Sequence, residues 1–388
     1  MHFRRRLQIC NTSRWATERA FMKVGVNYAW PCNHWSTFVG LEQGKLDPGY
    51  KWRESVPRNF ALLQRIGVSV VRIWLFANGA QYGNQPRLNN RRFRRRPASS
   101  DYAFDPPEEI SQAYVDRIHF LCDSADSTGL QLIPVFFDFG VFAGLDTAIL
   151  NQNAGGGRVN IATDDDDRQK FLSGTLDKIL DSFSAKQRNA ILAFDAFNEP
   201  EWEIKHQSLR EEALTFFLGE CTAHIEKNGF VSTVGHATAS ALCRLVAGQW
   251  PQVHYYPDPP GTFWAKVSQL RGIRLFDQRQ TPPKHRARIK GAFLGEFGGT
   301  TWNPWPECQG KDLHDNFAVY ERLTTAAELG YNLALLWPDA GKRLLEQSVE
   351  QDSLKFQKTS LKQIKAFTSG MPLSDLPNFL GEPFSKTP

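Results

Sequence analysis

Two glutamates stand in short polar motifs that interrupt apolar stretches of the sequence. Glu199 belongs to "LAFDAFNEPEW" at 192–202, and Glu296 belongs to "AFLGEFGG" at 292–299. A pair of carboxylates on opposite walls of a cleft can cleave a glycosidic bond. The protonated carboxyl donates to the leaving oxygen, while the ionised one meets the oxocarbenium-like carbon. These residue types therefore make bond cleavage at a sugar acetal the first hypothesis.

The two motifs lie within a repeating pattern of amphipathic helix, glycine, apolar run and polar loop. Helical periodicity is found at 60–66, 114–125, 214–225 and 313–323, before Gly67, Gly129, Gly229 and Gly330. Glycine after a helix supplies a left-handed cap, and continuous apolar runs are typical of parallel strands covered on both faces. Strands are predicted at 23–28, 69–76, 130–138, 191–197, 230–235, 252–256, 291–296 and 331–337.

Strands that alternate with helices in this way predict a single-domain (β/α)8 TIM barrel. We expect the barrel to span 22–370, with an irregular C-terminal tail at 371–388. The first 21 residues are expected to be an N-terminal extension, either disordered or upstream of a true start at Met22. An open doubly wound sheet is the alternative. It is disfavoured because no glycine-rich phosphate loop follows the first strand.

Reactive side chains of such a barrel lie at the carboxyl ends of its strands. The residues at or just beyond these ends are Asn27, Tyr28, Arg72, Asp138, Asn198, Glu199, Trp202, His236, His254, Tyr256, Glu296 and Trp337. A set of residues that served stability alone would not collect at one mouth of a barrel. We therefore expect Glu199, on strand four, to face Glu296, on strand seven, across the barrel mouth.

Several of these motifs, in this order, resemble clan A glycoside hydrolases, close to glycoside hydrolase family 5. They are "NEP" after strand four, "HYYP" ending strand six, "GEFG" in strand seven and Trp337 ending strand eight. The resemblance runs from Val24 to Trp337, nearly the whole predicted barrel. It implies a retaining mechanism with Glu199 as acid/base and Glu296 as nucleophile.

The same resemblance implies roles for the residues around the two glutamates. Asn198 would bind the 2-hydroxyl of the sugar, and Trp337 would form the floor beneath it. Arg72 and Tyr256 would keep Glu296 ionised, since an opposite charge lowers the pKa of a carboxyl group. His254 would help to orient the acid/base.

One position departs from the family pattern. Members often carry a histidine just after strand three, where this chain has Gly140 in "FFDFGVF". We therefore expect one substrate contact, or part of the acid/base network, to be missing or replaced. The substrates implied are β-linked glucose or mannose units. The sequence does not determine whether the sugar is glucose or mannose, nor whether the cleavage is endo or exo. The segment 77–107 is expected to decide between endo and exo cleavage.

Two other functions stay open. A carbohydrate-binding barrel that has lost turnover is conceivable because of Gly140. The arginine-rich "RRFRRR" at 91–96 could bind a polyanion, but the net charge of +5 is small and favours a solvated loop. No nucleic-acid partner is therefore expected, and the sequence does not set the oligomeric state.

Composition and motif spacing limit the cofactors and the location. No histidine–cysteine spacing typical of zinc occurs, and "DDDD" at 164–167 is predicted to form the first turn of a helix. No metal or organic cofactor is therefore expected. No apolar run approaches about 18 residues, so no membrane partner is expected. The extension lacks the apolar segment of a secretory signal, and the six cysteines form no CxxC motif, so a cytoplasmic location is expected.

Overall fold

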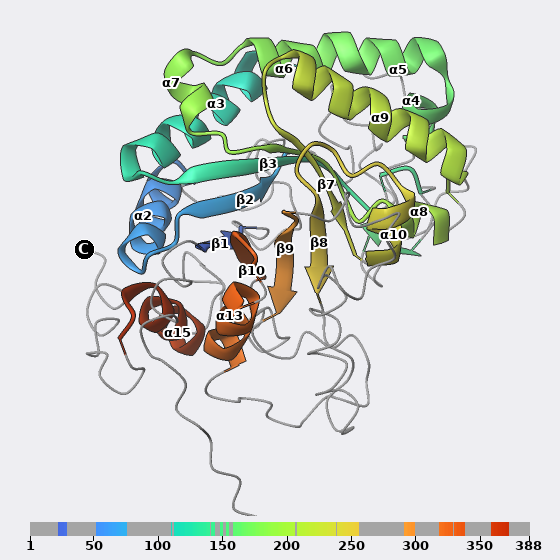
Figure 1. Cartoon of the computed structure of the whole chain (residues 1–388). Helices are drawn as coiled ribbons and strands as arrows, with labels where there is room; N and C mark the ends of the chain where they lie inside the picture. The colour runs from blue at the N-terminus through green and yellow to red at the C-terminus, as the bar shows by residue number, and fades with distance from the viewer. Residues whose placement is uncertain are drawn as a thin grey trace, which may run out of the picture.

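Parallel strands close into a barrel in the computed structural model of the chain (Figure 1). The structure describes residues 22–28, 52–75, 110, 112–139, 141–143, 148–149, 153–154, 158–205, 208–237, 239–255, 291–298, 318–328, 330–337 and 358–371. The barrel strands are β1 (Lys23–Asn27), β2 (Val70–Trp74), β3 (Gln131–Asp138), β6 (Phe194–Asn198), β7 (Ser232–His236), β8 (Gln252–Tyr255), β9 (Phe293–Gly298) and β10 (Leu333–Trp337). Their order around the barrel is β1-β10-β9-β8-β7-β6-β3-β2. All eight predicted strands are confirmed, and so is the predicted barrel.

Helices surround the barrel on the outside (Figure 1). The longer ones are α2 (Trp52–Arg65), α3 (Gln112–Thr128), α9 (Glu211–Lys227), α13 (Ala318–Glu328) and α15 (Lys358–Ser369). The shorter ones are α4 (Asn160–Thr163), α5 (Asp165–Phe171), α6 (Lys178–Asp181), α7 (Ala185–Asn189), α8 (Glu201–Lys205) and α10 (Ala239–Arg244), with a π-helical turn at Leu172–Asp177. A small hairpin of β4 (Ala148–Ile149) and β5 (Asn153–Ala154) lies apart from the barrel sheet.

The predicted helix ends are found where the glycines stand. Gly67, Gly129, Gly229 and Gly330 all have positive φ, between 71° and 86°. The acidic run also behaves as predicted, because the Asp164 side chain accepts a hydrogen bond from the backbone nitrogen of Asp167 at the start of α5. Strand β6 begins later than predicted, since Ile191 makes only a single bridge to β3.

The barrel interior is filled in layers along the strand direction. An apolar layer contains Val70, Ile133, Ala193, Phe293, Leu333 and Leu335, all at 0% exposure. Further along β2 comes the polar Arg72, and then Trp74, which packs with Val135 and Trp337. The apolar layer closes the amino-terminal part of the barrel, so the polar groups gather toward the carboxyl ends of the strands.

Strand β6 carries one extra residue near its carboxyl end. Asp195 pairs with Thr233 of β7, but Asn198, three residues later, pairs with Gly235, only two residues later. Side chains alternate along a regular strand, so residues three apart would point to opposite faces. A bulge removes this conflict. It allows Asp195 and Asn198 both to point into the barrel.

Strand β9 carries the same irregularity at Gly295. Val253 and His254 are consecutive on β8, yet their partners on β9 are Leu294 and Glu296. Gly295 is therefore the extra residue, and the register against β10 shifts at the same place. Bulges of this kind re-aim a side chain. Here the bulge turns Glu296 toward the barrel interior.

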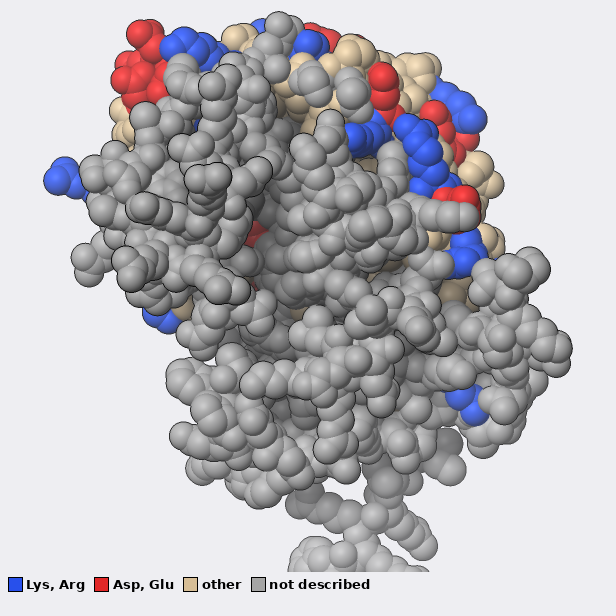
Figure 2. Space-filling view, turned by 180° about the vertical axis from the view of Figure 1, so that it is seen from behind, with Lys and Arg blue, Asp and Glu red and all other residues tan. Residues whose placement is uncertain are grey.

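Charged side chains of both signs are interspersed on the described part of the surface (Figure 2). Of the helices that the structure describes, none has both the length and the apolar content to cross a bilayer. Cys122 and Cys221 are buried free thiols. Residues 1–21, 77–107 and 372–388 lie outside the described residues, as does Gly140.

Candidate active site

The guanidinium of Arg72 is the centre of a buried polar cluster at the carboxyl ends of the strands. It donates to Asp195 Oδ2 from Nε (3.0 Å) and Nη2 (2.7 Å), to Asn27 Oδ1 (3.0 Å) and Glu296 Oε1 (2.6 Å) from Nη1, and to Asn198 Oδ1 from Nη2 (2.7 Å). Burial by itself would lower the pKa of Arg72, but the charges of Asp195 and Glu296 outweigh it, so the net shift is upward. The guanidinium is therefore a permanent cation between two carboxylates.

Asp195 is a cluster residue that the sequence prediction missed. It is fully buried in the apolar stretch "AFDAF", and its Oδ1 also accepts from the backbone nitrogens of Phe197 (3.2 Å) and Gly235 (3.1 Å). A charge inside an apolar strand is seldom buried without a partner. That signal, combined with Arg72 in a second apolar strand, could have identified this ion pair.

Glu199 directly follows the last residue of β6 in an uncommon backbone conformation. Its φ is 53°, and no other non-glycine residue among those described has a positive φ. Its peptide nitrogen donates to the Gly235 carbonyl at 2.6 Å. Its carboxyl group accepts from Trp202 Nε1 at Oε2 and from His254 Nδ1 at Oε1, both at 2.9 Å. Strained backbone of this kind concentrates at functional sites, and here it presents one carboxyl group to the cluster.

Gln252 decides which nitrogen of His254 carries the proton. The side-chain nitrogen of Gln252 lies 3.0 Å from His254 Nε2, and the Thr233 hydroxyl donates to Gln252 Oε1 (3.3 Å). An amide nitrogen only donates, so Nε2 of the ring accepts and the proton of the neutral ring lies on Nδ1, facing Glu199. A Cβ at Gly295 would lie 2.2 Å from the Gln252 nitrogen, so the glycine makes room for this contact.

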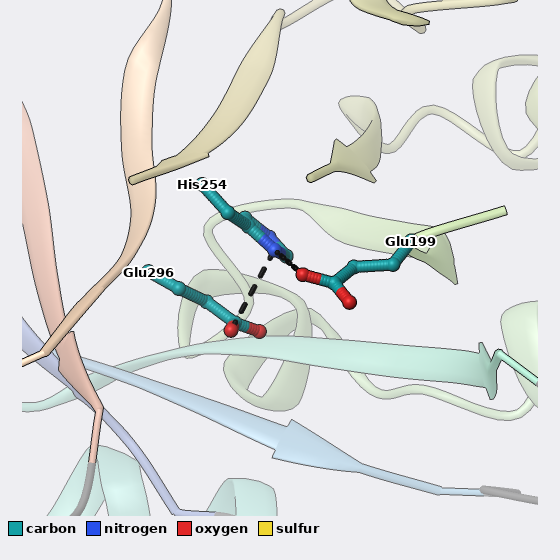
Figure 3. A group of neighbouring side chains, drawn as sticks. All are labelled: Glu199, His254 and Glu296. Atoms are coloured by element: carbon teal, nitrogen blue, oxygen red, sulfur yellow. Dashed lines mark hydrogen bonds and ion pairs between the residues drawn. The ribbon is translucent and has the colours of Figure 1, made fainter. Parts of the chain in front are cut away.

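His254 lies between the two glutamates (Figure 3). Its Nδ1 is 2.9 Å from Glu199 Oε1 and 3.5 Å from Glu296 Oε2. One oxygen from each carboxyl group and this nitrogen all lie within 4.8 Å of one another. Asn27 supports the arrangement from β1, because its Nδ2 donates to the Gly295 carbonyl (3.0 Å) in the β9 bulge. The two glutamates predicted to face each other are therefore in one cluster.

The environments of the two carboxyl groups differ. Burial, and then the nearby charge of Glu201, raise the pKa of Glu199 to about 8, although the Trp202 hydrogen bond and Arg72 act in the opposite direction. Glu296 instead accepts a short hydrogen bond from Arg72. At neutral pH one carboxyl group holds a proton while the other faces a cation, which is the division that acid–base chemistry needs.

Glu199, His254 and Glu296 are also the described side chains whose geometry could hold a metal ion. Imidazole nitrogen and carboxylate oxygens are common zinc ligands. Two features oppose a cation here, however. Gln252 keeps the proton on the nitrogen that would have to bind the metal, and Arg72 already supplies a positive charge to the cluster. The donor set therefore fits proton transfer better than metal binding.

Two more predicted residues lie at the rim of the cluster. Asp138 Oδ1 accepts from Asn198 Nδ2 at 2.6 Å, which holds the asparagine amide in place. Trp337 packs edge-on against Trp74, with ring centroids 5.5 Å apart, and the Trp74 ring in turn lies 4.5 Å from the guanidinium carbon of Arg72. Both aromatic rings therefore flank the polar cluster on the side of β2 and β10.

Three predicted residues are not part of this cluster as described. Tyr28 points outward, because Asn27 points inward and side chains alternate; its ring packs on Phe60 and its hydroxyl accepts from Asn59 of α2. His236 is buried and bonded to a backbone carbonyl, with its other ring nitrogen toward Glu201. Tyr256 lies outside the described residues.

Comparison with solved structures identifies the architecture. The chain resembles the β-mannanase of the blue mussel Mytilus edulis (TM-score 0.56, 15% identity, 90% of this chain and 92% of that one). It also resembles the endo-1,4-β-mannanase of Eisenia fetida (0.58, 14%, 91% and 92%) and a GH5_18 protein of Streptomyces cattleya (0.56, 15%, 90% and 81%). No family model and no curated protein matches the sequence. The fold is thus that of clan A, glycoside hydrolase family 5-like barrels, as the motifs predicted.

Proposed function

We propose that the chain is a retaining β-glycoside hydrolase, with Glu199 as acid/base and Glu296 as nucleophile. The observation that carries the proposal is the pairing of unlike carboxyl groups in one cluster. An oxygen of Glu199 lies within 4.8 Å of an oxygen of Glu296. Retaining enzymes place these groups about 5–5.5 Å apart, whereas inverting enzymes need about 6.5–9.5 Å to admit a water molecule.

The neighbours of each carboxyl group support these roles. Glu199 would donate its proton to the glycosidic oxygen as the bond to the anomeric carbon breaks. Glu296, kept ionised by Arg72, would attack that carbon and form a glycosyl–enzyme ester. Glu199 would then take a proton from water as the water displaces Glu296, which returns both groups to their starting states. The hydrogen bonds from His254 Nδ1 and Trp202 Nε1 would stabilise Glu199 while it is ionised.

The proposed substrates are short β-linked oligosaccharides of mannose or glucose. Similar structures named β-mannanase, together with one named exo-β-1,4-mannosidase from an Opitutaceae bacterium (TM-score 0.54, 14% identity), favour mannose. The GH5_18 protein of Streptomyces cattleya was solved with GlcNAc, so β-N-acetylglucosaminides belong in the substrate panel. Product sizes from mannan, glucan and their oligosaccharides would test the proposal. Rapid cutting within polymers, with little action on disaccharides and trisaccharides, would refute the preference for short substrates.

Two substitutions test the roles of the glutamates. Glu296→Ala should lower turnover of every substrate by about 10³-fold or more, because no covalent intermediate can form. Glu199→Ala should be slow on natural glycosides but should keep the glycosylation step with activated aryl glycosides, whose leaving groups need little protonation. Azide should then rescue the later step and yield a glycosyl azide of retained configuration.

The matched control is Glu212→Ala, which removes an exposed glutamate from the first turn of α9. It should keep the wild-type rates. Wild-type rates in both Glu199→Ala and Glu296→Ala would exclude the assignment. If the protein instead bound oligosaccharides without cleaving any glycoside, it would be the non-catalytic binding barrel.

A further inference from the structure

The indole N–H of Trp74 is a buried hydrogen-bond donor beside the polar cluster. Trp74 is the last residue of β2, and its side chain is only 1% exposed. Its Nε1 is buried and finds no hydrogen-bond acceptor in the part of the chain that the structure describes. A buried tryptophan N–H usually has a partner, because an unsatisfied donor away from water is costly. This N–H therefore calls for an acceptor that the described side chains do not supply.

The neighbours of the ring explain why the N–H has no acceptor. The guanidinium carbon of Arg72 lies over the ring, 4.5 Å from its centroid, and a guanidinium group only donates. Trp337 packs edge-on, with the two ring planes at 87°, and Val135 completes the apolar cluster around the ring. An indole and an alkyl side chain offer no lone pair for a conventional hydrogen bond. None of these three side chains can accept from Nε1.

Trp74 lies closer to the barrel mouth than the cluster that it contacts. It stands two residues beyond Arg72 on β2, so both side chains point into the barrel and Trp74 is nearer the carboxyl end. The ring is in contact with Trp337 of β10, and β10 lies directly opposite β6 in the eight-strand order. Glu199 follows the end of β6. The paired tryptophans and Glu199 therefore stand on different walls of the mouth.

We propose that Trp74 is a substrate-binding residue, and that its Nε1–H donates to a hydroxyl of the sugar that stays on the enzyme. The inference rests on the proposed hydrolase function, which gives the substrate its direction. Glu199 has to face the leaving oxygen, so the sugar that forms the ester with Glu296 extends toward Trp337 and Trp74. The hydroxyls at carbons 3, 4 and 6 of that sugar lie away from the bond that breaks, and each can accept a hydrogen bond.

This donor selects for the hydroxyl that it binds. The Arg72 guanidinium beneath the ring is itself held by Asp195 and Glu296, so the ring is in place before a sugar arrives. The N–H gives up no protein partner when it binds the sugar. A sugar that lacks the matching hydroxyl leaves the buried donor unsatisfied, and sites built to hydrogen-bond a hydroxyl discriminate against such analogues. Trp74 is therefore a specificity-determining residue.

The experiment compares the wild type with Trp74→Phe on aryl β-mannosides and β-glucosides and on their 3-, 4- and 6-deoxy forms. Phenylalanine keeps an aromatic ring but has no N–H. kcat/KM should fall about tenfold on the parent glycoside, and equally for good and poor leaving groups, because the contact is to the retained sugar. One deoxy glycoside should lose as much with the wild type and nothing more with Trp74→Phe, as expected for two groups in contact. Wild-type kcat/KM in a folded Trp74→Phe protein would overturn the contact and leave the hydrolase proposal intact.

Trp250→Phe is the matched control. Trp250 Nε1 already donates to the Gly291 carbonyl at 3.0 Å, and the ring packs against the apolar layer in the amino-terminal part of the barrel. Its kcat/KM should equal that of the wild type on every glycoside. If Trp74→Phe does not fold, benzothienylalanine at position 74 makes the same test, because its sulfur replaces the N–H while the ring keeps its size.

A second measurement does not depend on turnover. Labelling the indole nitrogens with nitrogen-15 gives one N–H resonance per tryptophan, and Trp74→Phe identifies the resonance of Trp74. In Glu296→Ala protein, at least one of β-1,4-mannobiose, cellobiose and N,N′-diacetylchitobiose should move it downfield and leave the Trp250 resonance in place. If it moves although the wild type cleaves no glycoside, the sugar contact stands and the hydrolase proposal fails. A resonance that none of the three sugars moves would overturn the contact, and so would one shifted upfield in the free protein, because the N–H would then point at the Trp337 ring.

Discussion

Replacing Arg72 by methionine removes the guanidinium that contacts both Asp195 and Glu296. Methionine fills much of the same volume, so the main change is electrostatic. Asp195 (0% exposed) and Glu296 (3% exposed) would both lose the cation that faces them. Removing one partner of a buried ion pair costs about 3–5 kcal/mol, because the remaining charge is left without compensation. With two carboxylates depending on one cation, we expect the upper part of that range, about 4–5 kcal/mol.

A loss of this size is a large part of the total stability of a typical domain, about 5–15 kcal/mol. Urea unfolding, followed by tryptophan fluorescence and by far-ultraviolet circular dichroism, would measure it, and coincident transitions would justify a two-state fit. Arg72→Lys keeps the charge, but a single ammonium cannot reach four partners, so we expect a loss of roughly 2–3 kcal/mol. It supplies the measurement if Arg72→Met does not fold.

Arg244→Met is the matched control. Arg244 pairs with Glu211 at 3.2 Å, but the two side chains are 53% and 36% exposed. Exposed pairs of this kind contribute about 0–1 kcal/mol. If Arg72→Met lost no more stability than this control, the cluster would not contain two buried carboxylates that depend on Arg72, and the account of the site would be wrong. The difference between the two variants should shrink at low pH, where protonation removes the unpaired charges.

Two further predictions concern Glu199 and the β9 bulge. With its pKa at about 8, Glu199 should set the upper limb of the pH–activity profile, so kcat/KM should fall as the pH rises through about 8. Glu199 in the folded protein then keeps its proton up to a pH of about 8, whereas in the unfolded chain the same carboxyl group loses it above a pH of about 4.3. This group therefore lowers the free energy of unfolding as the pH rises from about 4.3 to about 8. Glu199→Gln should remove this pH dependence from unfolding measurements, and an unchanged dependence would contradict the raised pKa of Glu199. Gly295→Ala places a Cβ 2.2 Å from the Gln252 amide nitrogen, so it should displace Gln252 and lower kcat by about 10²-fold. A Gly291→Ala control introduces a Cβ that meets nothing within 4 Å, at a residue whose φ is 79°, so it should affect stability without lowering kcat.

Local sequence patterns were enough to predict the barrel. Apolar runs and helical periodicity depend only on neighbours along the chain, and the left-handed caps at Gly67 and Gly129 follow from the missing Cβ of glycine. The two glutamates were also predictable, because each is a charged residue at the carboxyl end of a strand, and parallel strands bring those ends together. The expectation that His254 lies beside Glu199 rested on the resemblance to a family, and the structure places its Nδ1 2.9 Å from that carboxyl group.

Tertiary structure alone decided which side chains of each strand face the barrel. Strict alternation would send Asp195 and Asn198 to opposite faces, yet both contact Arg72, because β6 carries an extra residue against β7. The same alternation, undisturbed in β1, turns Tyr28 away from the site. A bulge depends on pairing with neighbouring strands that are distant in sequence, so it leaves no periodic signal of its own. Which nitrogen of His254 carries the proton likewise depends on Gln252. The side-chain nitrogen of Gln252 lies 3.0 Å from Nε2 of the ring, and only the folded structure shows this contact.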